Sequence, residues 1–189
     1  MPTTTACSIS PASEFVPPDP TVVAPPIDPT VATDFLDVSE FIAFGPQPIQ
    51  RGLPQGLVER YSAAILRGRV LDEDGQPLPG VLVRILDHPE FGYTYSRFDG
   101  HYDLLVNGGG DLILDFQKSD RLRVQRQLRT TWRDWALVDD LRMIALDAQM
   151  TAVVLGPSAP AQLVSGSSIL DEDGTRQARV FFRPEPKRR

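Results

Sequence analysis

Between residues 63 and 146, apolar side chains recur at every second position in several short segments. Segment by segment, these residues are Val81, Val83 and Ile85; Tyr102, Leu104 and Val106; Leu112, Leu114 and Phe116; and Leu122, Val124 and Leu128. Successive side chains of a strand point to opposite faces of a sheet, so this spacing predicts strands with one buried face. We expect no amphipathic helix of three turns in this region.

Turn-forming sequences separate these segments, namely DEDGQPLPG, RFDG and NGGG. Several short strands joined by such turns are typical of a sandwich or a barrel. We therefore predict an all-β fold, a small antiparallel β-sandwich over residues 61–148. We further expect the Asp-Gly and Asn-Gly-Gly turns to close hairpins, because these residues adopt the backbone conformations that tight turns need.

The pentapeptide LDEDG occurs twice, at residues 71–75 and 170–174. An EF-hand loop requires oxygen ligands at positions 1 and 12 when its glycine is at position 6. The residues at those positions are Val70 and Val81 around the first copy, and Ile169 and Val180 around the second. Valine and isoleucine cannot bind calcium, and the sequences that follow the two copies differ. Both copies are therefore predicted to be turns.

Residues 1–60 differ in composition from the rest, because they hold 11 of the 18 prolines. Proline fixes φ and lacks a backbone donor, so we predict an irregular extension that is disordered alone. Its residues 34–45 carry an apolar cluster that either anchors to a partner or packs on this chain's own domain. Residues 149–189 are predicted to form a short β-hairpin and linker.

No catalytic, metal or cofactor site is predicted. The two histidines, His88 and His101, lie in turn regions without an oriented nucleophile, and two histidines with one distant cysteine do not make a zinc site. An enzyme built on these histidines and nearby acids remains a rival hypothesis. Cys7 has no second cysteine with which to form an internal disulfide.

A basic stripe runs from Arg121 to Arg133, in a chain whose net charge is −6. Its members are Arg121, Arg123, Arg126, Arg129 and Arg133. With Lys118, Trp132 and Trp135, the stripe could bind an anionic strand by charge and stacking. The interpretation that we favour is an outer strand face paired with the chain's own acids, since the negative net charge disfavours nucleic acid or an anionic membrane as a partner.

Residues 88–118 read HPEFGYTYSRFDGHYDLLVNGGGDLILDFQK. Together with RGRVLDEDGQPLPGVLVRIL before them and WRDW after them, they resemble the plug domain of teneurins and of bacterial Rhs (YD-repeat) proteins. The resemblance covers residues 66–182. It implies a sandwich of the transthyretin or carboxypeptidase-regulatory kind, also called a fibronectin-plug, which inserts into one end of a β-shell built from YD repeats and closes it.

The resemblance also implies a function. We expect a non-catalytic plug for a YD-repeat shell that encloses a toxin in a bacterial polymorphic toxin. The chain has no YD repeats, so the shell would be present in cis, if this chain is an N-terminal fragment, or in trans. The alternative is a surface or adhesion sandwich that binds carbohydrate or protein without a shell.

The residues expected at the partner interface are all aromatic. They are Phe35, Phe41 and Phe44 in the extension, and Phe91, Tyr93, Trp132 and Trp135 in the sandwich. Plain packing inside the sandwich is the alternative for the last four. We expect a cytoplasmic precursor without a membrane span, exported as part of a toxin complex by a route that needs no Sec signal peptide.

Overall fold

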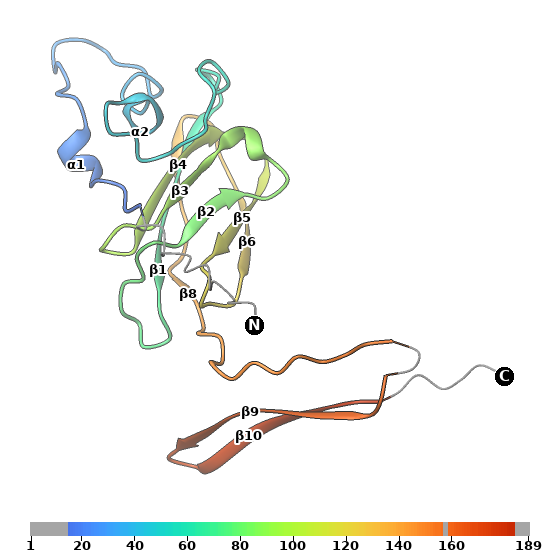
Figure 1. Ribbon diagram of the computed structural model, residues 1–189. Coiled ribbons are helices and arrows are strands. Elements are labelled where there is room, and N and C mark those ends of the chain that lie inside the picture. Colours follow the sequence, from blue (N-terminus) through green and yellow to red (C-terminus); the bar gives the residue numbers. More distant parts are fainter. Residues whose placement is uncertain (1–14, 157–158, 184–189) are drawn as a thin grey trace, which may run out of the picture. The chain divides into compact units, whose positions relative to one another are not determined.

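The computed structural model describes residues 15–156 and 159–183. These residues form two compact units, one that ends at Ala145 and one that begins at Leu146. The larger unit contains two β-sheets and the smaller one contains a β-hairpin (Figure 1). Cys7 lies outside the described residues.

The larger unit is a β-sandwich, as the alternating pattern predicts. The first sheet has the order β4 (His101–Asn107), β1 (Ala63–Leu71), β7 (Asp134–Leu137), with β8 (Leu141–Arg142) also paired to β1. The second sheet has the order β3 (Tyr93–Tyr95), β2 (Leu82–Ile85), β5 (Asp111–Gln117), β6 (Val124–Arg129). Pairing is antiparallel except along β1, where β7 and β8 run parallel. The all-β, mostly antiparallel class is therefore confirmed.

The core lies between the two sheets and is built from the alternating residues. Val81, Val83 and Ile85 are at most 2% exposed. Tyr102 of β4 meets Phe116 of β5 edge to face, with ring centroids 5.5 Å apart, so the two sheets pack directly on each other. Of the alternating residues, Leu122 lies outside this core, because it precedes β6 and is 48% exposed.

Both LDEDG copies are turns, as predicted. In the first, the Asp72 carboxylate accepts hydrogen bonds from the backbone N–H groups of Asp74 and Gln76, and Gly75 has a φ of 79°. The second copy joins β9 (Gln162–Asp171) to β10 (Gly174–Phe182) in an antiparallel hairpin.

Three of the predicted hairpins are wrong in their strand pairing. The turns at 72–75, 97–100 and 107–110 each connect a strand of one sheet to a strand of the other. After the first turn, for example, β2 pairs with β3 and β5 rather than with β1. The turn residues do reverse the chain direction. The strand that follows, however, joins the other sheet, so its apolar face reaches the core from the opposite side.

The N-terminal extension covers the outer face of β4 and β1. It contains α1 (Pro20–Val23) and α2 (Phe41–Phe44), and α2 packs against β4. Leu36, Ile42 and Ile49 are buried in the same apolar cluster as Ile65 and Leu105. Of the two alternatives for residues 34–45, the structure therefore shows packing on the chain's own domain.

Gln50 fixes the extension to β4. Its side-chain amide donates to the carbonyl oxygens of Phe91 (2.6 Å) and Leu105 (2.9 Å), and its Oε1 accepts from the Leu105 N–H (2.6 Å). Arg51 also forms an isolated β-bridge with Tyr93 of β3. The segment around Gln50 thus supplies the free edge of β4 with hydrogen bonds that another strand would supply.

The smaller unit contains the β9–β10 hairpin, which has a β-bulge between Gln177 and Arg179. Large apolar side chains project from both of its faces. Leu163, Ile169, Leu170, Val180 and Phe181 are all more than half exposed.

Candidate partner interface

Strand β7 forms an edge of its sheet and carries exposed apolar side chains. Among the described residues it pairs only with β1, so its other edge has no strand partner. Trp135 is 42% exposed and Leu137 is 77% exposed. Their strand partners on β1 are Ile65 and Arg67, which point away from the space between the sheets, so both apolar side chains lie on the outer face.

Trp132 lies just before β7 and is held in position, although the residue is 66% exposed. Its indole N–H donates to the Gly108 carbonyl at 3.2 Å. The ring packs over Gly109, where a Cβ atom would overlap the indole. We call Trp132, Trp135 and Leu137 the β7 surface.

A buried ionic cluster lies beside this surface. The Arg67 guanidinium stacks on the Trp135 ring at 4.4 Å and also donates to the fully buried Asp103 carboxylate at 2.5 Å. Arg97 donates to the other oxygen of Asp103 at 2.6 Å. The cluster therefore fixes the Arg67 side chain, which in turn orients Trp135.

A second buried carboxylate, Asp115, lies on the outer face of the other sheet. Burial alone would raise the pKa of Asp115, but hydrogen bonds from Arg123, Arg84 and Gln117 outweigh it, so its pKa is lowered. The distances to the arginine nitrogens are 2.5 Å for Arg123 and 2.9 Å for Arg84. This carboxylate is ionised and structural.

The seven aromatic residues predicted for the interface lie in different places. Trp132 and Trp135 share the β7 surface. Tyr93 is 36% exposed on the other sheet, and Phe91 is only 7% exposed in the core. In the extension, Phe44 is 39% exposed, whereas Phe35 and Phe41 are partly buried against the core.

Leu137 is not among the residues predicted for the interface. The signal for it is the alternation within WRDWAL, because a strand that begins at Asp134 places Trp135 and Leu137 on one face. A single pair at this spacing also arises by chance, so the signal in so short a strand is weak.

The basic stripe does not form one continuous face. Arg121 contacts Glu73 and Asp120, Arg123 contacts Asp115, and Arg133 contacts Asp34. Three of its five arginines are thus paired with acids of this chain, in line with the interpretation that we favour.

The histidines contact different carboxylates. His88 Nδ1 is 2.9 Å from Glu90, and His101 Nδ1 is 3.1 Å from Asp99. The Ser96 hydroxyl is buried, donating to the Leu78 carbonyl and accepting from the Val81 N–H. Within residues 15–156 and 159–183, no group of three or more metal-binding side chains comes together. None of the helices described there has the length and apolar character to cross a membrane.

Part of this sandwich is similar in sequence to known proteins. Residues 58–143 match the family model "Teneurin TTR-like domain". The chain is 45% identical over 76 residues to Teneurin-3 of Danio rerio, and 41% identical over 85 residues to Teneurin-1 of Gallus gallus. These matches cover 40% and 45% of this chain but only 3% of each relative.

Among solved structures, 3-chlorocatechol 1,2-dioxygenase from Rhodococcus opacus 1CP is similar, with a TM-score of 0.39 and 12% identity. The alignment covers 50% of this chain and 63% of the dioxygenase chain.

Proposed function

Because residues 58–143 form a teneurin TTR-like domain, we propose that this chain is a non-catalytic sandwich that docks on a YD-repeat shell and closes one of its ends. The observation that carries the proposal is the β7 surface. It combines an unpaired strand edge, within the described residues, with two exposed tryptophans and a leucine.

Such a surface suits a partner made of β-strands. An unpaired edge can accept a strand through backbone hydrogen bonds, and the flanking side chains then supply the apolar contact. Trp135 is pre-oriented by Arg67, so little side-chain freedom is lost when it is covered. Large aromatic residues of this kind dominate the energetics of protein interfaces.

A finer form of the proposal concerns what the shell contains. The resemblance of residues 88–118 to bacterial Rhs proteins supports a shell that encloses a toxin for use against competing cells.

The test is binding between this chain and the YD-repeat polypeptide encoded with it, in the same reading frame or a neighbouring gene. Biolayer interferometry with both purified proteins gives the dissociation constant. We expect Trp135→Ala to weaken binding by roughly thirtyfold, the effect typical of an interface hot spot. Trp132→Ala and Leu137→Ala should each weaken it by about tenfold.

The matched control is Ile113→Ala, because Ile113 is 36% exposed on the outer face of the other sheet. It should change the dissociation constant by less than about twofold, and thermal unfolding should show that every variant is folded. No binding, or equal losses at Ile113 and Trp135, would overturn the proposal. Glycan binding that both tryptophan variants remove would instead favour the adhesion alternative.

A further inference from the structure

The extension contains the tetrapeptide Asp-Pro-Thr-Val twice, at residues 19–22 and 28–31. A Pro-Pro pair precedes each copy, directly in the first and with Ile27 between in the second. We call residues 19–22 the first turn and residues 28–31 the second turn. Because both copies belong to one chain, their surroundings can be compared within one structure.

The two turns have the same internal hydrogen bonds. Asp19 Oδ1 accepts from the backbone N–H and the hydroxyl of Thr21 at 2.8 and 2.6 Å. Asp28 Oδ1 accepts from the same groups of Thr30 at 2.9 and 2.6 Å. In each copy the valine N–H also donates to the aspartate carbonyl, at 3.0 and 3.3 Å. The motif therefore folds locally into one fixed shape.

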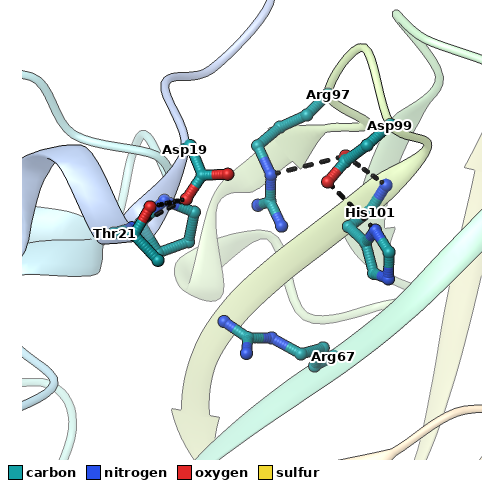
Figure 2. Close-up of a pocket in the computed structure, with 7 residues that line it drawn as sticks. Asp19, Thr21, Arg67, Arg97, Asp99 and His101 are labelled. Atoms are coloured by element: carbon teal, nitrogen blue, oxygen red, sulfur yellow. Dashed lines mark hydrogen bonds and ion pairs between the residues drawn. The ribbon is translucent and has the colours of Figure 1, made fainter.

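The surroundings of the two turns differ. The first turn faces the sandwich across a cavity of about 230 Å³. Figure 2 shows Asp19 and Thr21 on one side of this cavity and Arg67, Arg97, Asp99 and His101 on the other. The second turn lies within residues 24–33, all of which are exposed.

Two buried nitrogen atoms of the residues on the sandwich side make no hydrogen bond within the described part of the chain. Arg97 is only 6% exposed, and its Nε, which lies 3.7 Å from Asp99, makes no hydrogen bond within the described part of the chain. His101 Nδ1 is buried beside the same carboxylate, in an orientation that makes no hydrogen bond.

The charges across the cavity are complementary. Arg97 and Arg67 lie near enough to Asp19 to help lower its pKa, after the larger effect of the Thr21 hydrogen bonds. At Asp28 the hydrogen bonds from Thr30 lower the pKa, and no arginine contributes. The two aspartates therefore differ in what faces them, although their own turns are alike.

We propose that this cavity is a receptor for Asp-Pro-Thr turns, and that the second turn of one chain docks in the cavity of a second copy when the first turn has left it. The receptor's guanidinium groups complement the aspartate, and the repeated motif supplies a second ligand of the same shape. Within one chain the first turn occupies the cavity in preference to a turn from another chain. The reason is that its covalent connection to the sandwich gives it an effective concentration of the order of millimolar.

The segment that carries the first turn can leave without unfolding the sandwich. Beside the turn, Phe15 stacks on Arg51 at 3.4 Å and meets the Tyr95 ring edge to face, Pro17 is buried, and Val23 packs on the core. The exposed residues 24–33 then link it to the buried Leu36. Release of residues 15–23 therefore exposes the cavity and leaves the layer around Leu36 in place.

The test uses the full chain with Phe15→Ala, Asp19→Ala and Thr21→Ala, which removes one anchor and the first turn. A fluorescent peptide of residues 25–33 is the probe, and polarisation gives its affinity. We expect the variant to bind the peptide at least about tenfold more tightly than the unaltered chain, since the tethered competitor is gone. A peptide with Asp28→Ala and Thr30→Ala should bind at least about tenfold more weakly.

Sedimentation velocity supplies the second measurement. The triple variant should form dimers as its concentration rises. Adding Asp28→Ala and Thr30→Ala should return it to a monomer, whereas these two changes alone should leave the sedimentation of the unaltered chain unchanged. Absence of peptide binding, equal binding of both peptides, or dimers that persist without the second turn would overturn the proposal.

Discussion

Two fully buried aspartates hold arginine side chains against the outer faces of the sandwich. Asp103 binds Arg67 and Arg97, and Asp115 binds Arg84 and Arg123. Removing one partner from such a cluster is costly, because it leaves an uncompensated buried charge. These clusters therefore specify the positions of side chains, including the Arg67 that orients Trp135.

Tyr102 is a residue whose polar atom has no partner. Its side chain is fully buried, and its hydroxyl makes no hydrogen bond to the described residues. Burial, with a smaller effect from Asp103, raises its pKa well above the ordinary value. We expect Tyr102→Phe to raise the free energy of unfolding by about 1 kcal/mol, because it removes an unsatisfied buried group.

Urea unfolding measures this change. Tyr61→Phe is the matched control, since Tyr61 is 77% exposed, and it should alter stability by less than about 0.5 kcal/mol. A loss of stability in Tyr102→Phe would show that the hydroxyl has a partner and that the explanation is incorrect.

At the scale of elements, the extension acts as a third layer. It buries the face of β4 and β1 that the alternating pattern assigns to solvent. Gln50 is the residue on which this layer most depends, because it is fully buried and makes three hydrogen bonds to backbone groups.

Gln50→Ala should lower the free energy of unfolding by about 2–5 kcal/mol, since it leaves buried backbone groups of Leu105 and Phe91 without partners. Thermal and urea unfolding of the full chain measure the loss. The matched control is Gln47→Ala, because Gln47 belongs to the same segment but is exposed, and it should change stability by less than about 0.5 kcal/mol. Equal effects of the two changes would contradict the third-layer role.

Local pattern predicted the strands and their core faces, as residues 81–85 illustrate. It did not predict the burial of Leu105, because Leu105 belongs to one apolar cluster with Ile42 and Ile49 of the extension, which are distant in sequence. Nor did turn chemistry predict which sheet the next strand joins, since that depends on how apolar faces meet across the core. Of the aromatic interface candidates, Trp132 and Trp135 are near each other in sequence at β7, and both are exposed.

At the scale of the whole molecule, the two units differ in how much of their apolar surface is buried. The sandwich has a core between two sheets, whereas the β9–β10 hairpin exposes large apolar residues on both faces. A two-stranded hairpin alone is marginally stable in water, so we expect this unit to depend on a partner for its stability.

Hydrogen exchange followed by NMR or mass spectrometry tests this difference. In the isolated chain, amides of β9 and β10 should show protection factors below about ten, because local opening costs little free energy there. Amides of β1 and β4 provide the internal reference, and they should be protected by several orders of magnitude. Protection of the hairpin equal to that of β1 would contradict the expectation.

The parallel pairing of β7 and β8 with β1 has a consequence for synthesis. Strand β1 begins at Ala63, but the strands that complete its second edge end at Arg142, so about eighty residues must leave the ribosome between them. Until then the backbone hydrogen-bonding groups along this edge of β1 have no strand partner. Folding of this domain during synthesis can therefore be completed only after β7 and β8 have emerged. The extension precedes β1, so it is available earlier to cover the outer face of β1 and β4.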